Sequence, residues 1–250
     1  MRVLAVSPHL DDAAFSVGGT LAALVDAGHD VTVLTCFTAS VPDPTGFALA
    51  CQLDKGLPAD VDYLALRRAE DRAAMAVLGA EPVHLGLAEA PHRGYESAAE
   101  LFAGVHDGDE VWRALAAEVA GRGADADLWL APQALGGHVD HLQVLRAVAA
   151  AATPTPTWPG RPVAWWRDSP YVLRAPDAVP GLDLPAGLAE VTPAQRLDRR
   201  ADACACYPTQ LGFQFGGVEA MRAALADLTE VLLADPAARA LLGPTPEDLP

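Results

Sequence analysis

The sequence predicts an α/β fold in which a mostly parallel sheet carries helices on both faces. Short apolar segments rich in Val and Leu alternate with longer segments whose apolar residues recur at helical spacing. Such alternation gives right-handed βαβ units, in which consecutive strands run parallel and both faces of the sheet are covered. Two polar clusters that contain His and Asp directly follow apolar segments. Sheets of this Rossmann-like kind bind ligands at the carboxyl ends of their strands, so the clusters mark the expected site.

The first expected strand, residues 2–7, is a short apolar run that stops at Pro8, as a buried parallel strand does. The helix after it has apolar residues at helical spacing and ends at Gly28, a typical C-cap residue. The same patterns predict further strands at 31–37, 83–87, 128–131 and 163–166, and further helices at 66–78, 110–120, 139–152 and 218–233.

We expect one domain over residues 1–250, with a Pro-rich loop region at about 153–193. The stretch 153–162 follows the helix that carries the second polar cluster. We therefore expect it, together with the turn at 168–171, to border the pocket and to select the substrate.

Composition narrows the range of partners. Lys and Arg total 17 against 33 Asp and Glu, a formal charge of −16, so nucleic acid is not expected as a partner. No run of about 18 apolar residues and no secretory signal pattern is visible, so we expect a cytoplasmic protein without a membrane partner. The four cysteines form no CxxC pair and are expected as free thiols. A small-molecule substrate remains, and a homo-oligomer is left open.

The first chemical motif is Pro8-His9-Leu10-Asp11-Asp12, at the end of the first strand. Two adjacent carboxylates beside a histidine are costly to crowd together without a cation, so the motif favours a metal site. The alternative is a helix cap in which Asp11 or Asp12 accepts hydrogen bonds from free N–H groups of the first turn.

The second motif is Gly136-Gly137-His138-Val139-Asp140-His141, between a strand and a helix. Histidines three residues apart at a helix start project from nearly the same face, which suits one metal ligand and one neighbouring catalytic group. Such a pair is also common in ordinary surface clusters. Because both motifs follow strands of the same sheet, they indicate one metal site at its carboxyl edge.

These motifs resemble the LmbE-like, or PIG-L-like, N-acetylglucosaminyl de-N-acetylase superfamily, whose pattern is P-H-x-D-D after the first strand and H-x-D-H near the middle. Weaker matching features are Arg67 with Glu70, the Leu85-Gly86-Leu87 step before Glu89, Ser169-Pro170-Tyr171 and Tyr207-x-x-Gln210.

The resemblance implies a single divalent ion bound by His9, Asp12 and His141. Zn²⁺ is the expected ion, and Fe²⁺ or another divalent ion could serve instead. It also implies that Asp11 is the general base and that a protonated His138 faces the oxyanion. Asp140 is expected to orient a histidine by accepting its hydrogen bond, with helix capping as the alternative.

Arg67, Glu89 and Tyr171 are the expected substrate-binding residues. For Arg67 and Glu89, a surface charge or an ordinary ion pair is the alternative. Tyr171 could form an aromatic wall with Trp158, Trp165 and Trp166, or these rings could belong to the core. The sequence departs from the mycothiol-pathway branch of the superfamily at Gly136, where that branch has a tyrosine.

The expected function is a metal-dependent hydrolase that removes an N-acyl group, above all N-acetyl, from an amino sugar or a glycosylated small molecule. An amidase acting on a non-sugar N-acyl metabolite is the main alternative. An inactive metal- or sugar-binding module would have lost Asp11 or His138, and both are present. A non-haem iron enzyme shares the ligand types, but such enzymes are usually β-barrels and not alternating α/β chains.

Overall fold

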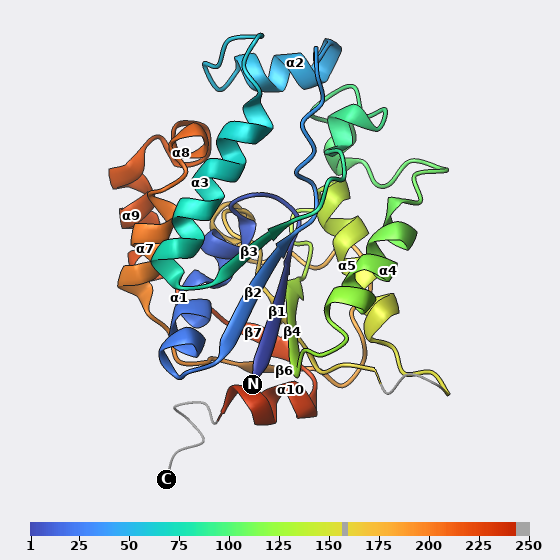
Figure 1. Ribbon diagram of the computed structural model, residues 1–250, viewed down its shortest axis with the longest axis vertical. Coiled ribbons are helices and arrows are strands. Elements are labelled where there is room, and N and C mark those ends of the chain that lie inside the picture. The colour runs from blue at the N-terminus through green and yellow to red at the C-terminus, as the bar shows by residue number, and fades with distance from the viewer. Residues whose placement is uncertain (157–159, 244–250) are drawn as a thin grey trace.

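The computed structural model describes residues 1–156 and 160–243, and this part of the chain contains a seven-stranded sheet with the order β3-β2-β1-β4-β5-β7-β6 (Figure 1). The first five strands in this order are mutually parallel. The last two are antiparallel, β7 to β5 and β6 to β7. The strands are β1 (Arg2–Ser7), β2 (Asp30–Thr35), β3 (Glu81–His84), β4 (Leu128–Pro132), β5 (Val163–Trp166), β6 (Ala189–Val191) and β7 (Leu232–Ala234).

Helices connect and cover these strands, which confirms the expected α/β fold with a mostly parallel sheet. They are α1 (Asp12–Asp26), α2 (Gly46–Leu53), α3 (Tyr63–Leu78), α4 (Val111–Arg122), α5 (Val139–Ala152), α6 (Tyr171–Arg174), α7 (Leu197–Cys204), α8 (Pro208–Phe215), α9 (Val218–Ala226) and α10 (Pro236–Leu242), with short 3₁₀ turns η1 (Ala90–His92) and η2 (Glu100–Phe102).

The two faces of the sheet contribute to two separate apolar clusters, because successive side chains of a strand point to opposite faces. In β1, Val3 and Ala5 belong to the cluster that includes α1, α3 and α9. Leu4 and Val6 belong to the cluster that includes α4 and α5. Figure 1 shows α1, α3, α7, α8 and α9 on one side of the sheet and α4 and α5 on the other.

One glycine explains how closely α7 approaches α1. A Cβ atom at Gly19 would lie 2.9 Å from Oε1 of Glu230 and 3.3 Å from the backbone N of Arg196. The buried carboxylate of Glu230 accepts hydrogen bonds from the N–H groups of Gly19 and Thr20 and pairs with Arg200. This contact fixes α1, and with it the position of the first motif.

Several sequence-based boundaries are wrong in the last third. The helix expected at 218–233 ends at Ala226, and its last apolar residues form β7 instead. The loop region 153–193 holds β5, as expected, but also α6 and β6. Trp165 and Trp166 are each 1% exposed and pack into the core on opposite faces of the sheet, so they form no aromatic wall. Trp158 lies outside the described residues.

Within the described ranges, each helix is either too short or too polar to span a membrane.

Candidate active site

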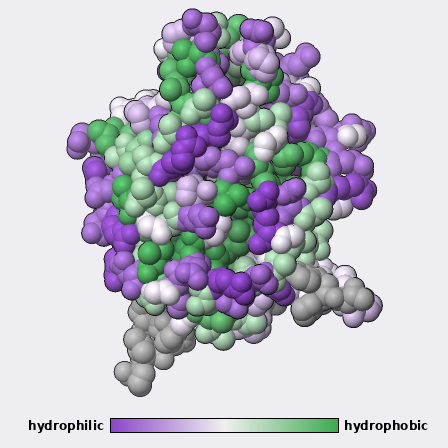
Figure 2. Space-filling view, viewed as in Figure 1, coloured by the Kyte–Doolittle hydropathy of each residue, from purple (hydrophilic) through white to green (hydrophobic). Residues whose placement is uncertain are grey.

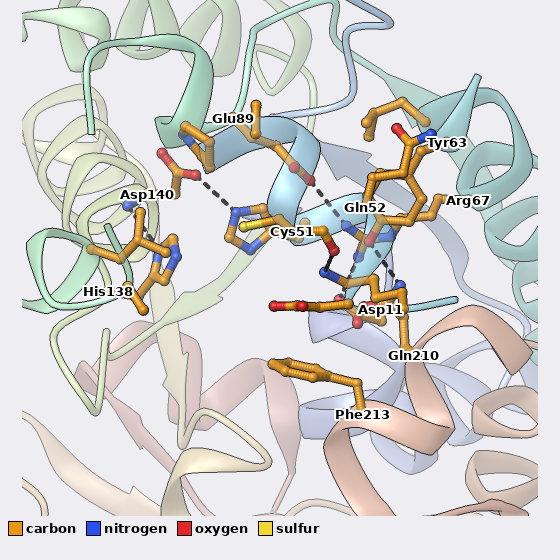
Figure 3. A pocket seen from close by; sticks show the side chains of 18 of the residues that line it. Asp11, Cys51, Gln52, Tyr63, Arg67, Glu89, His138, Asp140, Gln210 and Phe213 are labelled. Carbon is orange, nitrogen blue, oxygen red and sulfur yellow. Dashed lines mark hydrogen bonds and ion pairs between the residues drawn. The ribbon is translucent and has the colours of Figure 1, made fainter. Parts of the chain in front are cut away.

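The two motifs meet because β1 and β4 are neighbours in the sheet. The first motif follows the carboxyl end of β1 and enters α1, and the second follows β4 and enters α5. Both lie along a cavity of about 390 Å³, whose lining also includes residues from α2, α3, η2, α6 and α8. In Figure 3, His138 and Asp140 lie on one side of this pocket, and Asp11 and Arg67 lie on the other.

The side chains of His9, Asp12 and His141 converge so that one ligand atom of each lies within 4.8 Å of the others. Oδ2 of Asp12 is 3.2 Å from Nδ1 of His9 and 3.3 Å from Nε2 of His141. His141 is fully buried and Asp12 is nearly so. The atoms facing one another are therefore two imidazole nitrogens and one carboxylate oxygen, a donor set that suits zinc.

The remaining nitrogen of each imidazole is held by a carboxylate. Nε2 of His9 lies 2.9 Å from Oδ2 of Asp140, and Nδ1 of His141 lies 2.7 Å from Oδ1 of Asp168. If each carboxylate accepts a hydrogen bond from the N–H group of its histidine, the lone pair of the other ring nitrogen faces Asp12. Nε2 of His141 is also a buried atom without a hydrogen-bond partner. This cluster therefore fits a divalent cation.

The electrostatics of the cluster also favour a bound cation. Burial disfavours a charged imidazole, but the hydrogen bonds to Asp12 and Asp140 outweigh it and raise the pKa of His9 to about 9. The pKa of His141 is likewise raised, because Asp12 and Asp168 outweigh its burial. The cluster thus stabilises positive charge, which protons supply when no cation is bound.

Asp11 is turned away from this cluster into different surroundings. Its Oδ1 pairs with Arg67 at 3.2 Å, and its Oδ2 accepts a hydrogen bond of 3.1 Å from the side-chain amide of Gln214. Burial raises the pKa of Asp11 to about 7, although the charge of Arg67 lowers it. A carboxylate with a pKa near neutrality suits a general base.

His138 is the N-cap of α5, and its Nδ1 accepts a hydrogen bond of 3.2 Å from the N–H group of Asp140. Its proton therefore sits on Nε2, which leaves an N–H donor for another group. Burial lowers the pKa of His138 to about 3. Both observations describe a neutral imidazole that donates from Nε2, and the protonated His138 that the resemblance implies stays a prediction.

Asp140 is wholly buried and surrounded by donors. Its Oδ2 accepts the N–H group of Ala90 at 3.1 Å in addition to the contact with His9, and its Oδ1 pairs with Arg93 at 2.8 Å. Arg93 pairs in turn with Asp109 at 3.0 Å. A helix cap does not describe these contacts, because they bind Asp140 to other segments.

The three expected substrate-binding residues all line the pocket. Arg67 is only 5% exposed, so it is not a surface charge, and it pairs with Glu89 at 3.0 Å as well as with Asp11. Tyr171 packs edge-on against His141 at 5.5 Å between ring centroids. A Cβ atom at Gly136 would lie 2.6 Å from Cδ1 of Tyr171, so the ring of Tyr171 occupies the space that a side chain at 136 would need.

The stretch 153–162 does not border this pocket: among the described residues none of its members lines the cavity, whereas Pro170 and Tyr171 do. The reason is topological. A helix that follows the carboxyl end of β4 must return the chain to the amino end of the next parallel strand. The connection from α5 to β5 therefore lies at the amino ends of the strands, away from the pocket. The expected position beside the pocket is therefore wrong for the described residues of 153–162 and confirmed for Pro170 and Tyr171 of the turn at 168–171, while a role of this turn in substrate selection stays a prediction.

Sequence reasoning missed Arg93 and Gln214, and it placed Asp168 in a turn beside the pocket without predicting its contact with His141. Asp168 stood beside the recognised Ser169-Pro170-Tyr171 segment, and its place after a strand was a usable signal. Arg93 and Gln214 occur in a loop and at the end of a short helix, where nothing in the local pattern distinguishes them from surface polar residues.

Known deacetylases are similar to this chain in sequence and in structure. The chain is 41% identical over 175 residues to a 2'-N-acetylparomamine deacetylase of Streptomyces fradiae, a match covering 68% of this chain and 57% of that relative. The chain thus spans little more than half of that relative's length.

Two solved structures are similar over most of their length. An A40926 pseudoaglycone deacetylase has 30% sequence identity and a TM-score of 0.74, covering 93% of this chain and 96% of that one. A zinc-inhibited form of teicoplanin deacetylase has 25% identity and a TM-score of 0.75, covering 94% and 97%. The family model described as PIG-L, GlcNAc-PI de-N-acetylase, matches residues 4–152, more than half of the chain, including both histidine–aspartate motifs. The chain therefore belongs to the PIG-L family.

Proposed function

We propose that this protein is a metal-dependent hydrolase that removes the N-acetyl group from an amino sugar carried by a small molecule. The observation that carries the proposal is the convergence of His9, Asp12 and His141, each imidazole held by a separate carboxylate, beside a base that is free of the cluster. The similar deacetylases support an amino-sugar substrate.

His9, Asp12 and His141 would hold the cation, and Zn²⁺ suits two imidazoles and one carboxylate best. A bound divalent ion supplies Lewis-acid chemistry at an acyl carbonyl and lowers the pKa of water to about 7. Asp140 and Asp168 fix the orientation of the two imidazoles.

Asp11 takes a proton from the attacking water and delivers it to the leaving amine. Arg67 and Gln214 hold its two oxygens in place for both transfers. The Nε2–H group of His138 donates a hydrogen bond to the carbonyl oxygen as negative charge develops there, a contribution on the order of 3 kcal/mol for one donor. Arg67, Glu89 and Tyr171 line the space that the sugar would occupy.

The test is acetate release from a panel of N-acetylated amino sugars and N-acetyl amino acids by the purified protein. We expect release from the sugars, and its loss in Asp11→Asn. Release from N-acetyl amino acids alone would favour an amidase acting on non-sugar metabolites, and no release from any compound would contradict the proposal.

A further inference from the structure

The pocket extends beyond the catalytic groups towards α2, a helix with an unusual distribution of side chains. Gln52 is its only polar residue and also its only buried one. The amide of Gln52 donates to the carbonyl oxygens of Pro58 and Val61, which anchors α2 from its polar side. The apolar side chains of α2 are consequently left half-buried or exposed. In Figure 2, hydrophobic residues are visible among hydrophilic ones at the end of the molecule where α2 lies.

The part of this apolar surface that faces the pocket is continuous with other apolar side chains. Phe47 and Cys51 are four residues apart, on one face of the helix, and both line the cavity with Ala48. Val41 and Phe213 line it too, although they are 36% and 65% exposed. We call Val41, Phe47, Ala48, Cys51 and Phe213 the apolar wall.

The apolar wall is connected to the reaction centre. The ammonium group of Lys55 lies 5.1 Å from the ring centroid of Phe213 and 5.3 Å from that of Tyr63, so Phe213 is held over the pocket by a cation–π contact. Gln214, the next residue, donates to Asp11. A group that covers Phe213 is therefore adjacent to a substrate placed at the base, as Figure 3 shows for Phe213 and Asp11.

We propose that the apolar wall is a subsite for the aglycone, and that the substrate is an amino sugar joined to an aromatic or otherwise apolar group. This inference rests on the proposed deacetylase function. Large apolar side chains left open to water in a concave site gain free energy when a ligand covers them. A polar aglycone would leave these side chains without a partner.

Two other occupants fit less well. An anionic membrane surface would be repelled, because Asp43, Asp54, Asp60 and Asp62 flank α2 and the chain carries a net charge of −16. A second protein chain would need a face of about 800 Å² per partner, whereas these residues line a cavity on the scale of a small ligand.

The experiment compares phenyl and methyl glycosides of N-acetylglucosamine. Their kcat/KM values are measured on the metal-loaded enzyme, and their affinities by calorimetry on metal-loaded Asp11→Asn. We expect the phenyl glycoside to be favoured roughly tenfold in both measurements. Phe213→Ala and Phe47→Ala should reduce this ratio to about 1–3, and Phe213→Leu should retain most of it because Leu still covers apolar surface.

The matched control is Leu53→Ala, on the same helix but 49% exposed and outside the pocket lining, and its ratio should equal that of the wild type. Equal affinities for the two glycosides, or an equal loss of preference in Leu53→Ala, would overturn the subsite. The subsite would also be overturned if the protein sedimented with phosphatidylglycerol–phosphatidylcholine vesicles and Leu53→Ala weakened this binding, because α2 would then bind a membrane surface. A binding preference without acetate release from either glycoside would support the apolar wall and contradict only the proposed reaction.

Discussion

Asp11 and Asp12 are adjacent and have the same side chain, yet their surroundings differ. Asp12 faces two imidazoles, whereas Asp11 faces a guanidinium and an amide. We propose that this difference in partners, and not the residue type, decides which carboxylate holds the cation and which one takes the proton. Substitutions that keep the shape and remove only the charge can separate these roles.

Asp11→Asn should keep the cation and lose turnover by roughly 10²- to 10⁴-fold, because an amide cannot accept the water proton. Asp12→Asn should instead lose most of the cation. Metal content by elemental analysis and acetate release are measured on both variants. Normal turnover by Asp11→Asn with the cation bound would show that another group is the general base.

The raised pKa of Asp11 predicts how kcat/KM depends on pH. Because burial raises this pKa to about 7, the carboxyl is protonated and inactive below that pH, and kcat/KM should rise as pH increases through 7. Arg67 lowers the pKa of Asp11, so Arg67→Met should move the acidic limb of the profile to higher pH.

Arg68→Met is the control, since Arg68 pairs with the carbonyl of Thr38 and with Ser40, away from the site, and its profile should match the wild type. A limb that stays in place in Arg67→Met, with the fold intact by circular dichroism, would show that Arg67 does not set the charge of Asp11.

Asp168 lies behind the expected cation site and touches it only through His141. Asp168→Asn should weaken metal affinity by roughly 10- to 100-fold, because the imidazole loses its charged acceptor and part of its basicity. The affinity is measured by competition with a chelator. Asp177→Asn, an exposed residue of the following loop, is the control and should bind metal as the wild type does. Unchanged metal affinity in Asp168→Asn would show that the contact between Asp168 and His141 contributes only packing.

At the scale of elements, the packing of α1 against α7 positions the first motif. Gly19→Ala would press a methyl group against Glu230 and the backbone of Arg196 and should destabilise the fold by roughly 1–3 kcal/mol. Gly121, inside α4, has no atom within 4 Å of its would-be Cβ. Gly121→Ala should therefore not destabilise the fold and should stabilise it by at most about 0.5 kcal/mol, because Gly121 lies in the last turn of α4, where helix propensity has less effect than in the interior. Thermal unfolding of both variants checks the pair, and equal shifts would contradict the close approach seen at Gly19.

For some helices and strands, the sequence pattern alone was sufficient to predict the bounds. Strands β1, β4 and β5 lie within a residue of their expected bounds, since they are buried and largely apolar runs, apart from the exposed Arg2 at the start of β1. The segment 218–233 misled because Leu232 and Leu233 continue a helical spacing, while pairing with β5 makes them a strand. The helix α2 was missed because its apolar residues are not on a buried face, so its pattern matches no standard period.

At the scale of the whole molecule, the sequence predicted which residues meet but not what holds them. His9, Asp12, His138 and His141 come together because their segments follow adjacent strands. The alternation of elements predicted that both segments lie at the carboxyl ends of strands of one sheet, but not that β1 and β4 are neighbours. Gln214 reaches Asp11 from a helix near the end of the chain, and Arg93 reaches Asp140 from a loop. Such contacts depend on tertiary packing of irregular segments, and no local period encodes them.

The requirement for a cation at His9, Asp12 and His141 is tested most directly by the metal dependence of acetate release. The protein is stripped with a chelator, and acetate release from an N-acetylglucosaminide is followed as Zn²⁺ is titrated back. We expect this requirement to appear as no release from the stripped protein, full recovery at about one equivalent of Zn²⁺, and no recovery at that ratio in His141→Ala. Undiminished release by the fully stripped protein, or recovery in His141→Ala at one equivalent, would contradict it.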